Sequence, residues 1–349
     1  MGLPAPVAEI FFEENKYKNL AKAKVGFIGK QTTYLNDKSL NRLLHKYSLE
    51  PPSGFILEYD QSTLNRSSLG GHFITDKCFI SLFGCESYSC IDVSAYEGAD
   101  VVADLNEEIP TQLHQSFDFI FDGSCLDNIF NPAIALQNIS KMLRPEGRVI
   151  LINHATWFNG PYSIFSPGWF FDFFTSNSYK DCQIYLGLFT NNKTLHLGPM
   201  LLYRFDPAND PGGYFPRVPN GANVIVIAIA EKGNNSTDQI LPIQHQYRDQ
   251  EGHISFNKKL EVIAKSNRRL FMSGNTAFPS HDPFVPITTL CPKLYFFRLQ
   301  ASLIPSKLPP PYANLVVRLL KRVTPVHVWT RMRSYYHGLR RQIARLLGN

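Results

Sequence analysis

A series of short apolar runs, each stopping at a glycine or an acid, constrains the fold of this chain more than any other feature. The runs stop at Gly29, Asp92, Asp104 and Asp122. Each run has the length and β-rich composition of a buried strand, and polar turn residues follow it. Strands of this kind in an open α/β sheet present their last residues to a ligand, whereas in other folds they only return the chain to solvent. The segments between the runs decide between these alternatives.

Helix signals separate these strands. Residues 39–47, with Asn36 or Asp37 as the N-cap, and residues 73–83 have helical periodicity. Residues 131–143 begin with Asn131 and Pro132, which suit a helix start. Residues 148–153 then form an apolar run typical of a strand buried on both faces. Alternating strands and helices predict a parallel, doubly wound α/β sheet of the Rossmann type. Two further strands are expected over residues 182–189 and 223–230.

The composition agrees with a globular protein. The chain has 349 residues, of which 44% are hydrophobic and 18% charged, so it can bury a sizeable core. No apolar run is long enough for a membrane-spanning helix, and the first residues lack a secretory signal. The six cysteines show no zinc-ligand or disulfide spacing, so we expect free thiols and no metal site. These features predict a cytoplasmic location.

The chain is expected to divide into four segments. Residues 1–23 form a helical lead-in, and residues 24–230 form the α/β domain. Residues 231–311 are polar and then Pro-rich, which is typical of an appendage with a linker. Residues 312–349 predict two basic amphipathic helices, broken near Pro325.

The basic C-terminal segment leaves several interpretations open. Residues 301–349 contain nine Lys or Arg and no acid, in a chain of net charge +6. A solvated helix face and an interfacial helix on an anionic membrane suit it equally, and the second would make the protein peripherally membrane-associated. Nucleic-acid binding is less favoured, because no zinc, RNP or helix-turn-helix signature accompanies the charge.

The carboxyl ends of the predicted strands favour a nucleoside cofactor. An acid after the second strand suits a ribose, because a carboxylate accepts hydrogen bonds from both vicinal hydroxyl groups. The phosphate-cradling loop of NTPases is absent from the sequence, and so is the G-x-G-x-x-G of dinucleotide-binding folds. S-adenosylmethionine is a nucleoside cofactor without a phosphate bridge, and it fits this pattern.

Three stretches of the sequence carry a family resemblance. They are SCIDVSAYEGADVVADLNEEIP, then FDFIFDGSCLDNIFNPAIALQNISKMLRPEGRVILIN, then GPYSIFSPGWFFDFF. In this order they resemble the class I S-adenosylmethionine-dependent methyltransferase-like proteins, over about residues 24–230. The resemblance implies a Rossmann-like methyltransferase fold with a C-terminal helical appendage, and it implies a divergent member of that family.

The resemblance also implies a set of cofactor contacts. Asp92 would hold the ribose, with Ser94 beside it, and Asp104 with Leu105 would flank the adenine. The turn after the first strand would contribute Gly29 and Gln31, and the loop with Asp122 and Gly123 would pass the methionine portion. The glycine-rich first loop of the family is reduced here to Gly29-Lys30-Gln31, and about sixty residues separate Gly29 from Asp92.

The catalytic positions depart from the family pattern. Where the family has Glu-His, this chain has Asp127-Asn128, and where it has His-Gly-Phe-Tyr, this chain has residues 159–162, Asn-Gly-Pro-Tyr. Both histidines that could act as a base are replaced, so Asp127 and His154 become the candidate bases. A structural role for a single histidine is the alternative at residue 154.

An aromatic block follows the fifth predicted strand. Residues 157–174 contain nine aromatic side chains in eighteen positions. For most of these rings we expect a place in the core or in an interface helix. Tyr162 and Phe165 are expected to line a pocket and, with Asn128, to contact the substrate.

The sequence therefore predicts methyl transfer from S-adenosylmethionine to an acceptor that the sequence does not identify. The aromatic block and the basic segment suggest a saccharide or lipid-linked intermediate. The alternative is a non-catalytic protein that keeps the fold as a binding or membrane-docking module.

Overall fold

The structure is a computed structural model, and it describes residues 2–61, 72–156, 160–189, 200–205, 223–244, 247–265 and 288–290. All of them belong to one compact unit, Met1–Phe296. The C-terminal segment of residues 312–349, for which basic helices are predicted, lies outside the described residues, as does the Pro/Gly-rich excursion of residues 206–222.

A nine-stranded sheet forms the centre of this unit, in the order β3-β2-β1-β4-β5-β8-β6-β7-β9. The strands are β1 (Lys24–Ile28), β2 (Ser87–Asp92), β3 (Val101–Val102), β4 (Phe117–Gly123), β5 (Leu143–His154), β6 (Asp181–Phe189), β7 (Met200–Phe205), β8 (Asn223–Glu231) and β9 (Thr288–Leu290). Strands β1 to β5 pair in parallel, while β8 runs antiparallel between β5 and β6. The predicted doubly wound α/β sheet is thus confirmed.

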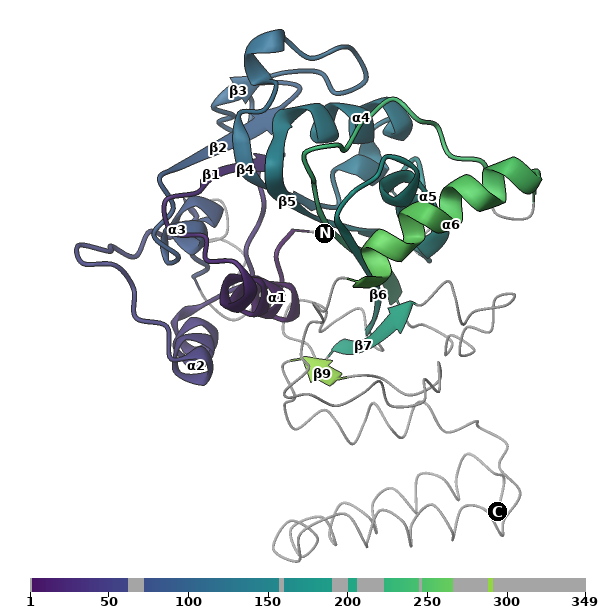
Figure 1. Cartoon of the computed structure of the whole chain (residues 1–349). Helices are drawn as coiled ribbons and strands as arrows, with labels where there is room; N and C mark the ends of the chain where they lie inside the picture. Colours follow the sequence, from purple (N-terminus) through teal and green to yellow (C-terminus); the bar gives the residue numbers. More distant parts are fainter. Residues whose placement is uncertain are drawn as a thin grey trace, which may run out of the picture. The chain divides into compact units, whose positions relative to one another are not determined.

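Helices cover both faces of the sheet (Figure 1). They are α1 (Ala5–Tyr17), α2 (Asp37–Tyr47), α3 (Asp76–Ser81), α4 (Pro132–Met142), α5 (Pro167–Ser176) and α6 (Gln250–Lys265). In Figure 1, helices α1, α2 and α3 lie on one side, and α4, α5 and α6 on the other. Local signals explain their starts: Asn36 and Ser39 form a capping box for α2, and Pro132 occupies the first turn of α4.

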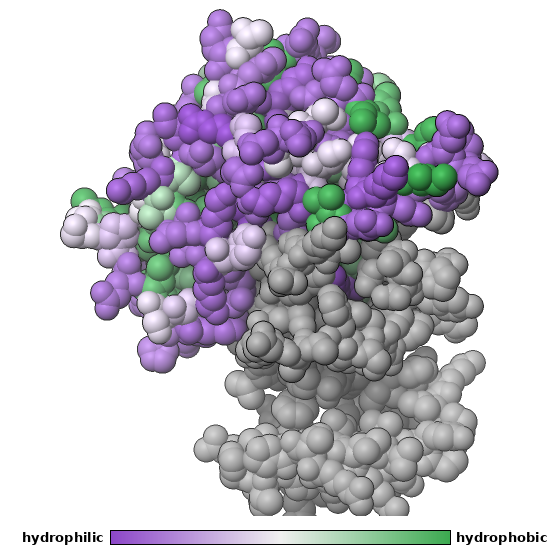
Figure 2. Space-filling view, viewed as in Figure 1, coloured by the Kyte–Doolittle hydropathy of each residue, from purple (hydrophilic) through white to green (hydrophobic). Residues whose placement is uncertain are grey.

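Phe11 is the centre of the core between α1 and the sheet. Its ring packs at 4.8 Å from Phe121 and 5.2 Å from Phe79, both centroid to centroid. All three side chains are fully buried, which places helix α1 inside the fold rather than on its surface. The face drawn in Figure 2 is mainly hydrophilic over the described residues, with small hydrophobic groups.

Helices α5 and α6 lie in the part of the chain that follows strand β5. Helix α5 arises from the aromatic block, and Phe170, Phe173 and Phe174 are buried, in agreement with the core interpretation of most of these rings. Helix α6 packs on α5, where Phe171 lies 6.4 Å from Phe256. None of the described helices is long and apolar enough to cross a membrane. The five described cysteines are free thiols.

Candidate functional site

The carboxyl ends of the parallel strands meet at one edge of the sheet. Ile28 at the end of β1 pairs with Ile91 of β2 and with Asp122 of β4, and Gly123 pairs with Ile152 of β5. The register therefore places the residues that follow these strands side by side, as the sequence predicts. We call this region the carboxyl edge.

Gly29 and Asp92 form one side of the carboxyl edge. Gly29 has a positive φ of 67°, and its N–H donates to Ile91 O at 2.7 Å. A Cβ on Gly29 would lie 3.0 Å from Cys125 Sγ and 3.5 Å from Asp92 Oδ2, so the turn passes close to the Asp92 carboxylate. Asp92 is partly exposed, and no described residue donates a hydrogen bond to its carboxylate. This carboxylate is an open acceptor.

Gln31 fills the turn after β1. Its Nε2 donates to Ile28 O at 2.8 Å and to Gly29 O at 3.2 Å. Its Oε1 is buried and has no hydrogen-bond partner among the described residues. A Cβ on Gly123 would collide with this oxygen, so Gly123 makes the close approach of the two loops possible. Gln31 thus takes the space that a longer glycine-rich loop would leave open.

The loops after β2 and β3 carry the other predicted cofactor residues. Asp104 is exposed, and its Oδ1 accepts from the N–H of Asn106 at 2.9 Å and from Asn106 Nδ2 at 2.8 Å. Leu105 is buried beside it, and Ser94 is exposed. Asp104 therefore stabilises its own turn, and its contact with an adenine stays a prediction, as do those of Leu105 and Ser94.

Asp122 points into the protein. Its Oδ1 accepts from the N–H groups of Cys125 at 2.7 Å and Leu126 at 3.2 Å, and its Oδ2 accepts from Asn153 Nδ2 at 2.8 Å. Full burial raises the pKa of Asp122 to about 7. The carboxylate thus holds the turn after β4 in place, and a contact of this residue with the cofactor stays a prediction.

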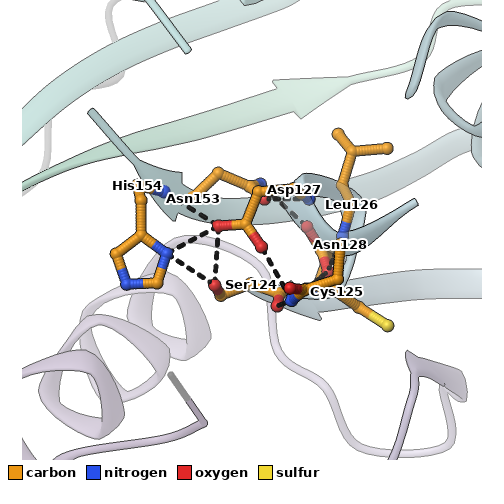
Figure 3. A network of polar contacts seen from close by, with 8 residues as sticks. Ser124, Cys125, Leu126, Asp127, Asn128, Asn153 and His154 are labelled. Carbon is orange, nitrogen blue, oxygen red and sulfur yellow. Dashed lines mark hydrogen bonds and ion pairs between the residues drawn. The ribbon is translucent and has the colours of Figure 1, made fainter. Parts of the chain in front are cut away.

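The two candidate bases contact each other (Figure 3). His154 Nδ1 lies 2.7 Å from Asp127 Oδ2, and the backbone N–H of His154 donates to the same oxygen at 3.1 Å. Ser124 Oγ also donates to Asp127 Oδ2, at 2.7 Å. Asp127 lies in the short helix η4 (Leu126–Asn128), and His154 is the last residue of β5. We call Ser124, Asp127 and His154 the polar network.

Asp127 is held as an anion inside this network. The side chain has no exposed surface, whereas that of His154 is 15% exposed. Burial alone would raise the pKa of Asp127, but hydrogen bonds from His154 and Ser124 outweigh burial and lower it. A buried carboxylate fixed on Nδ1 favours the histidine tautomer with its proton on Nδ1. Figure 3 shows the other ring nitrogen directed away from Asp127.

Ser124 is not arranged as a nucleophile. Its Oγ lies 3.0 Å from His154 Nδ1, the nitrogen that also contacts Asp127. In a hydrolytic triad the acid and the serine contact opposite ring nitrogens, so the histidine can take the serine proton. Ser124, with a positive φ of 75°, instead adds a donor to Asp127. The family resemblance implies only that Ser124 belongs, with Asp122 and Gly123, to the loop that passes the methionine portion, and it does not indicate the contact of Ser124 with Asp127.

Asn153 is a second residue that sequence reasoning missed. Its Oδ1 accepts from the N–H of Asp127 at 3.1 Å, and its Nδ2 donates to Asp122. The side chain is fully buried, and it links the Asp122 carboxylate to the backbone of Asp127. A signal was available, because an amide at the end of the apolar run 148–153 must find partners when that strand is buried.

The three predicted substrate residues differ in exposure. Asn128 Nδ2 donates to Ser124 O at 2.8 Å and to Asp127 Oδ1 at 2.9 Å, so both of its donor hydrogens serve the polar network. Phe165 is buried, with its ring 4.7 Å from that of Trp169. Tyr162 is 73% exposed. All three substrate contacts stay predictions; Asn128 and Tyr162 are exposed, whereas Phe165 is buried.

No family model and no curated protein sequence matches the chain. Among solved structures, it is similar to a phosphoethanolamine N-methyltransferase 2 of Haemonchus contortus, with 10% identity over 65% of this chain and 52% of that chain, at a TM-score of 0.34. A SAM-dependent methyltransferase of Thermotoga maritima has 12% identity over 65% and 91%, at 0.31. A protein assigned as a Zn-dependent alcohol dehydrogenase of Rhodobacter sphaeroides has 17% identity over 46% and 50%, at 0.25, so the chain spans about half of its length.

Because these scores are low, the fold class rests on the sheet of the chain itself. The central order β3-β2-β1-β4-β5-β8-β6, with β8 antiparallel between β5 and β6, is that of a doubly wound α/β sheet whose strand order reverses between β1 and β4. Of the candidate residues, the carboxyl edge brings together Gly29, Gln31, Asp92 and Gly123 on one side and Asp127 with His154 on the other.

Proposed function

We propose that this chain transfers a methyl group from S-adenosylmethionine to an acceptor bound at the carboxyl edge. The observation that supports the proposal most directly is the open carboxylate of Asp92 beside the turn at Gly29. A carboxylate in this place of an open α/β sheet can accept both hydroxyl hydrogens of a ribose.

The residues present fit such a cofactor. Asp92 offers two acceptor oxygens for the ribose, and Gly29 leaves space next to them because it has no side chain. Gln31 Oε1 is a buried acceptor without a donor, and leaving such a group unpaired costs roughly 1–3 kcal/mol. The ammonium group of the methionine portion is a donor that would pair with Gln31 Oε1. Asp104 and Leu105 would then border the adenine.

The main task of the protein in the proposed reaction is to position the acceptor. S-adenosylmethionine supplies a methyl group already activated on a sulfonium, so the chain must hold the acceptor in line with it. The polar network adds a proton acceptor. Asp127 holds the Nδ1 proton of His154, and this tautomer carries its lone pair on Nε2, which can accept the proton of the acceptor group.

The acceptor suggested by the sequence, a saccharide or lipid-linked intermediate, remains a proposal of the same standing as the cofactor contacts. Residues 312–349 are the segment for which binding to an anionic membrane surface is predicted, and they lie outside the described residues.

A non-catalytic binding module is the second candidate, and one observation favours it. Gln31 occupies the turn after β1, where the family resemblance implies a glycine-rich loop around the cofactor. If Gln31 cannot move, the methionine portion would be excluded, and the carboxyl edge would serve another ligand.

Isothermal titration with S-adenosylmethionine and S-adenosylhomocysteine separates the two candidates. We expect both to bind the full chain, and Asp92→Ala to weaken binding about tenfold to a hundredfold, the effect of losing charge-assisted hydrogen bonds. Glu97→Ala is the matched control, because Glu97 is an exposed acid on the same loop. Its affinity should equal that of the wild type.

Absence of binding at millimolar ligand would refute the methyltransferase proposal. Equal weakening by the two alanine substitutions would show that only the general negative charge of the loop matters, and Asp92 would then have no ribose role.

A further inference from the structure

Two exposed aromatic rings stand next to the polar network. The side chain of Phe130 is 80% exposed and that of Tyr162 is 73% exposed. Their ring centroids are 5.8 Å apart and their planes make an angle of 82°. Two rings at a right angle form a corner with two open aromatic walls. We call this pair the aromatic corner.

Backbone hydrogen bonds fix both walls of the corner. The N–H of Ser163, next to Tyr162, donates to Asp127 O at 3.1 Å, and the N–H of Phe165 donates to His154 O at 2.9 Å. On the other side, the N–H of Asn131, next to Phe130, donates to Asn106 Oδ1 at 2.9 Å. The backbone next to Tyr162 is therefore hydrogen-bonded to the polar network, and the backbone next to Phe130 is hydrogen-bonded to the loop of Asp104.

The segments around the corner carry negative charge and no basic side chain. Residues 87–140 contain no Lys or Arg, and residues 149–179 contain none either. The first segment has nine acids: Glu108 pairs with Lys141, Asp118 pairs with Arg144, Asp122 and Asp127 are buried, and Asp92, Glu97, Asp100, Asp104 and Glu107 reach the surface. Asp104 is linked to Phe130 through the Asn106 and Asn131 contacts. Charge complementarity therefore favours a cation at the corner.

The charge distribution of the aromatic rings also favours a cation. The face of an aromatic ring is its negative side and attracts an ammonium group within about 6 Å of the centroid. An anionic ligand, such as a phosphate ester, would meet both the ring faces and the acidic loops without an Arg or Lys partner from these segments. A neutral apolar ligand would gain from the rings but nothing from the charge.

We propose that the aromatic corner binds the ammonium group of a small organic cation, and that this cation is the acceptor of the methyl group. The second half of this statement rests on the proposed function, but the binding of the cation does not. The corner thus defines the substrate class as amines. The bound ammonium group would give a proton to His154 Nε2, the freed nitrogen lone pair would form the bond to the methyl carbon, and the carbon–sulfur bond would break to release S-adenosylhomocysteine. A quaternary ammonium compound such as choline can occupy the corner but has no nitrogen lone pair to methylate.

Choline chloride and its neutral isostere 3,3-dimethylbutan-1-ol are the probes for the full chain, titrated by calorimetry without cofactor. We expect choline to bind in the millimolar range, and the alcohol to bind at least about tenfold more weakly. The variants Tyr162→Leu and Phe130→Leu should each weaken choline binding about fivefold, whereas Tyr162→Phe should retain it.

Tyr247→Leu is the matched control, because Tyr247 is 72% exposed and lies outside the carboxyl edge. Its choline affinity should equal that of the wild type. Since all these side chains are exposed, we expect every variant to fold, which circular dichroism checks.

Three results would overturn the proposal: no choline binding by the wild type at millimolar ligand, equal binding of choline and the alcohol, or wild-type affinity in both corner leucine variants. The choline titration and the cofactor titration can give different results, so failure of one proposal is distinguished from failure of the other. Choline binding without S-adenosylmethionine binding would refute the proposed function and retain the corner as a cation site. The reverse result would retain the cofactor site and exclude the ammonium acceptor.

Discussion

Strand β5 carries one group of buried charges at its middle and another at its end, and the two groups are built differently. At the middle, Arg148 lies 2.6 Å from Glu14 Oε2 and 3.6 Å from Glu231 Oε2, and all three side chains are at most 3% exposed. Lys180 adds a contact of 3.0 Å to Glu231. At the late end, Asp127 is buried, but its partner His154 reaches the surface.

The two groups of charges suit different roles, one structural and one chemical. The group at the middle, which we call the ionic cluster, joins helix α1, strand β5 and strand β8, so it ties distant segments of the chain together. Its charges are paired inside the protein, and such groups hold a structure together or cost it stability. The polar network joins the loop after β4 to the last residue of β5, and it keeps one titratable ring accessible. Accessibility together with a buried anion is the arrangement suited to proton transfer.

The largest effect is expected for Arg148→Met. Removal of the guanidinium leaves the Glu14 and Glu231 carboxylates buried without their cation, so the free energy of unfolding should fall by as much as about 5 kcal/mol. Urea denaturation measures this change. Arg144→Met is the control, because the Arg144 to Asp118 pair is exposed and should contribute less than about 1 kcal/mol. Similar losses in the two variants would contradict the distinction between buried and exposed pairs.

The pH dependence of stability should come next in size, through Asp122. Its pKa is raised from 3.8 to about 7 by burial, so its contribution is full below about pH 4 and is lost as the pH rises towards 7. Relative to Asp122→Asn, the wild type should lose on the order of 4 kcal/mol of unfolding free energy over this interval. Denaturation at a series of pH values measures the difference. A difference that stays constant with pH would show that Asp122 ionises normally.

Asp127→Asn tests the polar network itself. An amide in this place cannot accept from His154 and Ser124 as the carboxylate does, so the unfolding free energy should fall by about 2 kcal/mol. Methyl transfer should slow by roughly a hundredfold to ten-thousandfold if His154 acts as the base. The affinity for S-adenosylmethionine should not change, because Asp92 is not involved. Weaker cofactor binding with unchanged turnover would show that Asp127 contributes to cofactor binding and not to proton transfer.

Gly29→Ala should lower the free energy of unfolding no more than Asp127→Asn does. An alanine at φ 67° costs about 1 kcal/mol in backbone strain, and its Cβ at 3.0 Å from Cys125 Sγ adds a further cost of about the same size. Gly98→Ala is the matched control, because Gly98 also has a positive φ, of 84°, but has no atom within 4 Å of the added Cβ. Thermal melting should therefore rank the wild type, Gly98→Ala and Gly29→Ala in that order. Equal losses would show that backbone conformation alone requires a glycine at residue 29.

The sheet and its edge follow from the sequence for a physical reason. In buried parallel strands the apolar runs are continuous and stop where the strand leaves the core, so Asp92, Asp122 and His154 mark strand ends reliably. Strand β7 and helix α6 were not predicted. Met200–Phe205 is a short run that is apolar except for Arg204, and such a run has no periodicity that separates a strand from a helix segment. Gln250–Lys265 is largely polar and has no strong periodic signal.

The orientation of side chains at the edge does not follow from the sequence. Asp92 and Asp122 both end a strand, yet one carboxylate is open and the other is enclosed by the turn that follows it. The outcome depends on whether the next backbone N–H groups turn back toward the carboxylate, which is a tertiary property. Gln31 is a similar case, because its place over Gly123 depends on contact between two loops far apart in the sequence.

Strand β5 also acts as an electrical spacer. Arg148 and His154 are six residues apart on it, which corresponds to about 20 Å at a rise of about 3.3 Å per residue. Salt screens the buried ionic cluster only weakly, but its acids and bases are paired, so their opposite charges largely cancel at this distance and exert little influence on the exposed histidine. The middle and the end of one strand can therefore change independently during evolution. The scaffold can gain or lose ion pairs around Arg148 without retuning the chemistry at His154.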